Sequence, residues 1–268
     1  MSANRIAQRF ADLKKQGRAG LVTFITASDP DHETAQSILN DLPGWGADFV
    51  ELGMPFSDPM ADGPVIEAAS KRALSAGASM VRTLEMVKSF RVTDTKTPLI
   101  LMGYYNPIHI YGTERFARDA AESGADGLII VDVPPEEGHE LHDPVHAAGL
   151  DIIRLVTPTT DDARLRVILD GAGGFLYYVT ITGVTGTASA DMEKLGAHVA
   201  QIRKQTSLPL AAGFGIKTPD DVAQMARHVD AVVVGSAIVN TIAGLPDGST
   251  TMGDVEKQVR DLAASLTD

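Results

Sequence analysis

The chain changes eight times from a short apolar segment to a segment with helical periodicity, and this alternation restricts its fold more than any other feature. Each apolar segment is typical of a buried β-strand, and the strands recur about every 25 to 30 residues. Apolar strands without strict alternation indicate a parallel sheet that helices cover on the outside. The expected strands span 20–27, 47–52, 98–103, 127–133, 151–156, 175–179, 208–212 and 231–234.

Eight strand–helix units in 268 residues, with no linker long enough to divide them, predict one α/β domain over 1–268, a (β/α)8 TIM barrel. An extra N-terminal helix is expected within 1–17, and a short extra helix at 236–242 follows the eighth strand. A doubly wound sheet is the alternative, but it usually carries a glycine-rich turn after its first strand, and 26–30 has none.

Several expected helices end in a shared pattern, in which glycine is followed by a small or apolar residue and then aspartate. Gly46, Gly124 and Gly149 begin three such junctions, which lead to Asp48, Asp126 and Asp151. Glycine accepts the left-handed conformation that often follows the last helical turn, so each junction predicts a helix end just before a strand.

The formal net charge of −12 argues against nucleic acid or an anionic membrane as a partner, because both attract basic patches. The absence of cysteine excludes disulfides, thiolate catalysis and cysteine-ligated metal.

The first 17 residues have the pattern of an amphipathic helix rather than a signal peptide, and no apolar run approaches the ~20 residues that span a bilayer. We therefore expect a cytoplasmic protein.

Glycines follow the seventh and eighth expected strands, in Gly-Phe-Gly-Ile at 213–216 and Val-Gly-Ser-Ala at 234–237. Glycine lets backbone amides approach an anion closely, and Ser236 begins a short helix whose N-terminus favours negative charge. This pattern predicts a phosphate site, although two plain tight turns are the alternative.

The segment 180–191, after the sixth strand, is rich in glycine and threonine and lacks periodicity. It is a candidate lid, and Gly186 could add an amide to the phosphate site. A long solvated loop is an equally good interpretation of its composition.

Two carboxylates lie close together in the sequence, Glu51 at the end of the second strand and Asp62 in the stiff proline-rich loop that follows. Alternation places Glu51 on the same face as Phe49, and an acid in an apolar barrel mouth has a raised pKa, as a general acid–base group needs near neutral pH. Asp62 precedes Gly-Pro, so a helix N-cap or turn is a strong alternative for it.

Histidines at 139, 142 and 146 could form a metal set, but a solvated helix face is the favoured interpretation. Tyr177, near the end of the sixth strand, could be a hydrogen-bond partner of Glu51. Phe24 and Phe214 would line an apolar pocket or fill the barrel core.

The segment 51–64, Glu-Leu-Gly-Met-Pro-Phe-Ser-Asp-Pro-Met-Ala-Asp-Gly-Pro, closely resembles the signature of the tryptophan synthase alpha chain family. The resemblance covers essentially the whole chain and keeps the family's order of motifs. The supporting segments are Tyr-Tyr-Asn-Pro at 104–107, Asp-Val-Pro-Pro-Glu-Glu at 132–137, Thr-Gly-Val-Thr-Gly at 182–186, 213–216, and Gly-Ser-Ala-Ile-Val at 235–239.

This resemblance implies a lyase of tryptophan biosynthesis that cleaves indole-3-glycerol phosphate, by a retro-aldol step, to indole and glyceraldehyde 3-phosphate. It implies no metal and no cofactor in this chain. The expected partner is a beta chain that holds pyridoxal phosphate and receives indole in an αββα (α2β2) heterotetramer. The loops after the second and sixth strands would face that partner.

By the same resemblance, Glu51 is the acid–base group and Asp62 accepts from the indole N–H, stabilising positive charge on the ring. Tyr177 would orient Glu51, and Thr185 in the lid would close over the acids. The indole pocket would be shaped by Phe24, Leu101, Met102, Tyr104 and Phe214, and the phosphate held by Gly186, Gly215, Gly235 and Ser236. Many family members carry arginine shortly after the motif at 182–186, where this chain has Thr187 and Ala188.

Two alternatives remain. One is another phosphate-binding barrel, such as indole-glycerol-phosphate synthase or an isomerase of the same pathway, which would usually place a catalytic lysine at a strand end. No lysine lies in the first six expected strands. The other is a catalytically weak chain that mainly binds and activates a beta-type partner.

Overall fold

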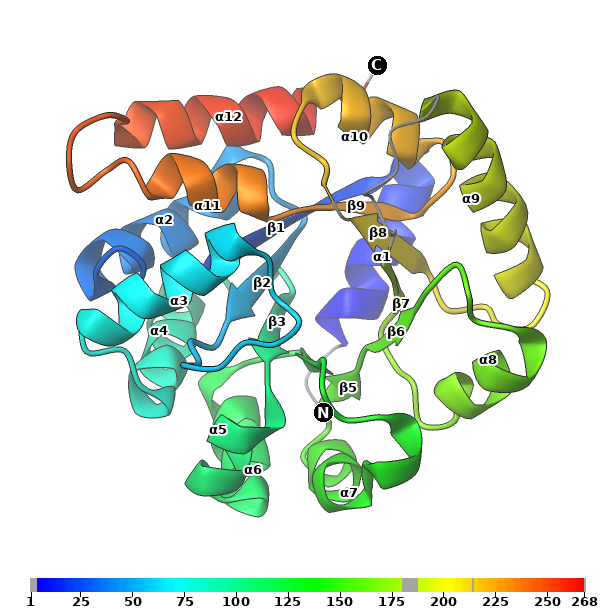
Figure 1. Cartoon of the computed structure of the whole chain (residues 1–268), viewed down its shortest axis with the longest axis horizontal. Helices are drawn as coiled ribbons and strands as arrows, with labels where there is room; N and C mark the ends of the chain where they lie inside the picture. Colours follow the sequence, from blue (N-terminus) through cyan, green and yellow to red (C-terminus); the bar gives the residue numbers. More distant parts are fainter. Residues whose placement is uncertain (1–3, 180–187, 214, 268) are drawn as a thin grey trace.

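The computed structural model describes residues 4–179, 188–213 and 215–267, with only the backbone described for 188–191. All its strands are parallel and form one sheet in the order β5-β4-β3-β2-β1-β9-β8-β7-β6, which curves into a barrel surrounded by helices (Figure 1). The strands are β1 (Gly20–Thr26), β2 (Phe49–Gly53), β3 (Leu99–Gly103), β4 (Gly127–Ile130), β5 (Asp151–Ile152), β6 (Arg154–Val156), β7 (Leu176–Val179), β8 (Leu210–Gly213) and β9 (Ala231–Val234).

The helices alternate with the strands, as expected. They are α1 (Arg5–Gln16), α2 (His32–Trp45), α3 (Pro64–Ser75), α4 (Met80–Thr93), α5 (Tyr105–Tyr111), α6 (Thr113–Ser123), η1 (Pro135–Glu137, a 3-10 turn), α7 (His139–Ala147), α8 (Asp162–Leu169), α9 (Ala188–Ile202), α10 (Pro219–Ala226), α11 (Ser236–Ile242) and α12 (Met252–Ala264). The (β/α)8 barrel is confirmed, and α1 and α11 are the two extra helices that the sequence predicted. None of the helices within the described ranges is long and apolar enough to cross a membrane.

The fifth expected strand is divided at Ile153. Its first part, β5, pairs with β4, whereas its second part, β6, pairs with β7. One strand thus changes neighbours halfway along its length, so the eight expected strands are present as nine segments. On the C-terminal side of Ile153, β4 and β6 are not paired with each other among the residues described.

Helix α5 and the start of helix α9 differ from expectation, and α5 depends on a tertiary contact. Helix α5 was not predicted; its first amide, on Tyr105, donates to Oδ1 of Asp132 at 2.9 Å, from the loop after β4. Helix α2 is capped by Asp31, which accepts from the Thr34 amide. Helix α9 begins at Ala188, inside the segment 180–191 that was expected to lack helical periodicity.

Helix α1 closes the N-terminal end of the barrel. Its apolar face, formed by Ile6, Phe10 and Leu13, is buried against side chains of the barrel interior. The ring centroid of Phe10 lies 4.6 Å from that of Phe49 on β2 and 5.8 Å from that of Phe175, just before β7. The interior is therefore solid at this end, so a substrate could enter only at the other.

Aspartates near the N-terminal ends of the strands bind the neighbouring strand. Asp48 accepts from the Leu21 amide at 3.0 Å, Asp126 from the Leu99 amide at 2.8 Å and Asp230 from the Leu210 amide at 2.8 Å.

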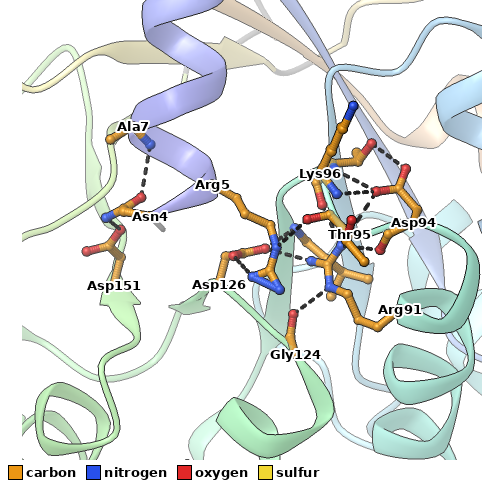
Figure 2. A network of polar contacts seen from close by, with 12 residues as sticks. Asn4, Arg5, Ala7, Arg91, Asp94, Thr95, Lys96, Gly124, Asp126 and Asp151 are labelled. Carbon is orange, nitrogen blue, oxygen red and sulfur yellow. Dashed lines mark hydrogen bonds and ion pairs between the residues drawn. The ribbon is translucent and has the colours of Figure 1, made fainter. Parts of the chain in front are cut away.

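Arginines balance the charge of these aspartates. Figure 2 shows Arg5 of α1 and Arg91 of α4 converging on Asp126, with N···O distances of 2.8 and 2.7 Å. Arg18 pairs with Asp48 at 2.7 Å. The closed end of the barrel is thus fixed by both apolar packing and buried charge pairs.

Candidate active site

Glu51 lies on β2, in register with Phe24 of β1 and Ile100 of β3. Its side chain faces the barrel interior, as alternation from Phe49 predicts, and it is 0% exposed. Neither carboxyl oxygen has a hydrogen-bond partner among the described residues. Burial raises the pKa of Glu51 to about 8. This is a carboxyl group that keeps its proton at neutral pH and has both oxygens free for a ligand.

This burial has a measurable cost. Between an ordinary pKa of 4.5 and the folded value of about 8, the unfolded chain loses the Glu51 proton while the folded chain keeps it, so the free energy of unfolding falls as pH rises through this range. We expect Glu51→Gln, which cannot ionise, to be no more stable than the wild type near pH 4. By pH 8 it should be more stable by on the order of 3 kcal/mol.

Urea denaturation at several pH values measures this difference. The matched control is Glu85→Gln on the exposed surface of α4, which should show no such widening with pH. If the free energies of unfolding of Glu51→Gln and wild type differed by the same amount at every pH from 4 to 8, the raised pKa of Glu51 would be contradicted.

Asp62 is not the cap of α3. The N-cap residue is Gly63, and no side chain caps this helix. Instead, the half-buried Asp62 carboxyl lines the same pocket as the phenol of Tyr104, close enough for the phenol to lower its pKa, and the Tyr104 oxygen accepts from the Ala61 amide at 3.0 Å. Burial raises the pKa of Asp62 and the Tyr104 phenol opposes this rise. Tyr104 therefore fixes both the loop and its carboxylate; the sequence indicated Tyr104 only as a pocket residue.

A small pocket brings together several of the expected site residues. Phe24, Asp62, Met102 and Tyr104 all line a cavity of about 20 Å3 at the C-terminal ends of β1 to β3. Phe24 is 8% exposed and packs against α3 and α11. This volume holds about one water molecule, so an indole ring would enter only after neighbouring side chains move.

Leu101 does not belong to this pocket. It is fully buried between the sheet and the surrounding helices, whereas its neighbours Ile100 and Met102 pack in the barrel interior. Successive side chains of a strand point to opposite faces, so only one of Leu101 and Met102 can face the substrate side. The expectation for Leu101 is therefore wrong.

Tyr177 of β7 lies close enough to Glu51 for the two groups to interact electrostatically. Burial raises the pKa of Tyr177 well above 10, and the Glu51 charge raises it further. No hydrogen bond joins the two side chains in the part of the chain that the structure describes. The two side chains are therefore near neighbours, and the orienting role expected of Tyr177 stays a prediction.

Two expected phosphate-binding glycines follow β8 and β9, and one of them, Gly215, has a positive φ that favours glycine. Gly215, after β8, has a φ of +71°, and Gly235 follows β9 and is the N-cap residue of α11. A Cβ on Gly235 would lie 3.2 Å from that of Phe24, so this turn and the apolar pocket are adjacent. No side chain caps the α11 N-terminus at the exposed Ser236. Thr185, Gly186 and Phe214 lie outside the described residues, as does the part 180–187 of the lid expected at 180–191; residues 188–191 of that segment begin helix α9.

The three histidines do not form a metal set. Within the described ranges, no group of three or more histidine, aspartate or glutamate residues could hold a metal ion. The favoured alternative, a solvated face, is wrong for His142, which is 9% exposed and contacts the buried Arg154.

One contact that positions the loop carrying Asp62 was not indicated by any sequence motif. Asp29, after β1, is 2% exposed and accepts two hydrogen bonds from Arg72 of α3, at 2.8 and 2.9 Å. The pair fixes α3, and so the loop that carries Asp62, against the end of β1. Neither residue belongs to a motif, because the contact depends on how helix and strand pack.

A parallel eightfold barrel, closed at one end and carrying a buried acid at the other, has the architecture of a (β/α)8-barrel enzyme. Residues 10–267 match the family model of the tryptophan synthase alpha chain, and the chain belongs to this family.

Solved structures agree with the family match. The tryptophan synthase alpha subunit of Legionella pneumophila strain Paris is 41% identical, with 98% of each chain covered and a TM-score of 0.91. A structure from Aquifex aeolicus VF5 is 32% identical over 98% of this chain and 99% of that one, with a TM-score of 0.90. An aminoacrylate-bound tryptophan synthase from Mycobacterium tuberculosis is 29% identical over 98% of this chain and 100% of that one, with a TM-score of 0.87.

The family determines the reaction. Its members are lyases of tryptophan biosynthesis that cleave indole-3-glycerol phosphate to indole and glyceraldehyde 3-phosphate. They act with a beta chain, which holds the pyridoxal phosphate, and they carry no cofactor of their own. Membership therefore decides against the other phosphate-binding barrels considered for this sequence.

Proposed function

We propose that Glu51 and Asp62 perform the cleavage, with Glu51 as the acid–base group. The observation that carries this proposal is the fully buried Glu51 carboxyl, protonated near neutral pH and with both oxygens unpaired. Glu51 gives its proton to C3 of the indole ring, which produces an indolenine-like cation. Removal of the glycerol hydroxyl proton then breaks the carbon–carbon bond, and its electron pair returns to the ring. Glu51 takes that proton, so it ends the cycle as it began.

Asp62 acts on the other side of the ring system. Its carboxylate accepts from the indole N–H and stabilises the positive charge that develops when C3 is protonated. This role requires the ionised form. The Tyr104 phenol favours that form by donating to the carboxylate, against the effect of burial.

The remaining contacts divide between the ring and the phosphate. Phe24, Met102 and Tyr104, which line the small pocket, surround the indole ring with Phe214, and Tyr177 orients Glu51. The amides of Gly186, Gly215, Gly235 and Ser236 hold the phosphate, and Thr185 closes over the acids. Closure excludes water from the reacting carbon and strengthens both carboxyl interactions.

We further propose that 1–268 forms one barrel domain that works in the cytoplasm, within an αββα assembly. The loops after β2 and β7 face the beta chain. Release of glyceraldehyde 3-phosphate from indole-3-glycerol phosphate, measured with and without a beta chain, tests the catalytic roles. Release in neither condition would favour a chain that only binds and activates its partner.

Replacing Tyr104 with phenylalanine separates positioning from pocket shape. We expect Tyr104→Phe to lower kcat/KM about tenfold, because a charge-assisted hydrogen bond is lost while the ring stays in place. Without its donor, the pKa of Asp62 rises, so the acid limb of the kcat/KM profile should move to higher pH.

A pH–rate profile measures this shift, with Tyr105→Phe as the matched control on the adjacent residue. An acid limb at the same pH in Tyr104→Phe and wild type would show that Tyr104 has no part in setting the Asp62 charge. Thermal melts of both variants exclude a general loss of fold.

A further inference from the structure

A second cavity, of about 420 Å3, lies where the fifth barrel strand changes neighbours. Its walls come from the ends of β4 to β6, the turn before α7, and α8. This volume is in the range of small-molecule sites. The lining residues used below are Pro134, His142, Arg154, Thr157, Thr159 and Arg164.

The cavity has a buried cation in its wall. Arg154 is only 6% exposed and faces the helices, since its neighbours Ile153 and Leu155 face the barrel interior. Its Nη2 donates to Nδ1 of His142 at 2.9 Å, and its Nε has no hydrogen-bond partner. Among the described residues, no carboxylate forms an ion pair with this guanidinium.

Arg154 differs in this respect from Arg91, a similarly buried arginine that pairs with Asp126 at 2.7 Å. One carboxylate, Asp132, lines the cavity, and it accepts from the Tyr105 amide. The charges of Glu136 and Asp170 act on Arg154 from a distance, and Glu136 forms its ion pair with Arg164. His142 does not balance the charge either: burial and the Arg154 charge lower its pKa to about 4, so it is neutral at physiological pH. A buried arginine without an anion is costly, and this cost would be relieved by a bound anion.

We propose that this cavity is a binding site for a small oxyanion, a carboxylate or a phosphate, with the guanidinium of Arg154 as its main ligand-binding group. Arginine presents several donors in a planar fork that suits both anions. The hydroxyl groups of Thr157 and Thr159 also line the cavity and lie 2.9 Å apart. They can contribute further donors.

The site is distinct from the one that holds the substrate phosphate. Arg154 lies on β6, whereas the glycine turns at 215 and 235 follow β8 and β9, so one and two strands respectively lie between them in the sheet order. In Figure 1, α7 and α8 lie on the opposite side of the barrel from α11. The inference thus depends on neither Glu51 nor the substrate.

Anomalous diffraction locates the anion directly. We expect crystals soaked in selenate to show one peak beside Arg154 and another near Ser236. In Arg154→Met, which keeps the apolar stem but removes the charge, only the peak near Ser236 should remain. A wild-type crystal with a peak near Ser236 and none beside Arg154 would overturn the inference. The reverse pattern would count against the proposed phosphate turn alone.

Solution binding identifies the class of anion. The whole chain is titrated calorimetrically with inorganic phosphate and, separately, with acetate, at constant ionic strength. We expect Arg154→Met to raise the dissociation constant of the second site by about tenfold or more, and Arg154→Lys, which keeps the charge, to raise it less. The matched control is Arg166→Met, on the exposed face of α8.

Each result has a definite meaning. An Arg154-dependent site for phosphate alone assigns a phosphate ligand, and a site for acetate alone assigns a carboxylate ligand. A site for both supports the shared oxyanion chemistry. If wild type and Arg154→Met bind both anions identically, the unpaired guanidinium is hydrated and the proposal is wrong.

Discussion

Glu51→Gln should lower the turnover of indole-3-glycerol phosphate by about two to four orders of magnitude, the range that a positioned acid–base group contributes. Glutamine has nearly the same shape and fits the same buried position on β2, but it cannot transfer a proton. The phosphate turns and the apolar pocket remain intact, so substrate affinity should change little. Steady-state release of glyceraldehyde 3-phosphate and calorimetric binding of uncleaved substrate to the variant measure the two quantities separately.

The comparison of the change in turnover with the change in substrate affinity decides the role of Glu51. Wild-type turnover in Glu51→Gln would remove Glu51 from the chemistry. An equal loss of affinity and turnover would make it a binding group instead. The variant should also be the more stable protein above neutral pH, so a loss of activity cannot be attributed to unfolding.

Asp62→Asn should reduce turnover by on the order of a hundredfold, because an amide can still accept from the indole N–H but cannot stabilise the cation. The fold should be preserved. Gly63, not Asp62, caps α3, so we expect the free energy of unfolding to change by less than about 1 kcal/mol.

Turnover and urea denaturation of the isolated chain test both parts of this expectation. Asp58→Asn is the matched control, since Asp58 is exposed in the same loop. A large loss of stability with unchanged turnover would return Asp62 to a structural role.

The barrel and Glu51 could be predicted because both depend on local regularity. Recurring apolar segments define the strands, and a period of two places Glu51 beside Phe49 on the inner face. The same rule separates Met102 from Leu101, and applying it from Ile100 would have avoided the wrong assignment of Leu101.

Features that depend on contacts between distant segments could not be predicted. Asp62 precedes Gly-Pro like a helix cap, and only its contact with Tyr104, 42 residues away in the sequence, shows otherwise. Helix α5 begins where Asp132 accepts its first amide. His142 lies in a polar segment, but the neighbouring strand, which is divided at Ile153, brings Arg154 within hydrogen-bond distance of it.

The aspartates at the closed end of the barrel have a consequence at the open end. Asp48, just before β2, accepts a hydrogen bond from the Leu21 amide of β1. This contact fixes the register between β1 and β2. A slip of one residue would turn Glu51 outward to the helices and bring Leu52 into the interior. The orientation of Glu51, the proposed catalytic acid, is thus set near the N-terminal end of its own strand, so ion pairs remote from the proposed site can affect its chemistry.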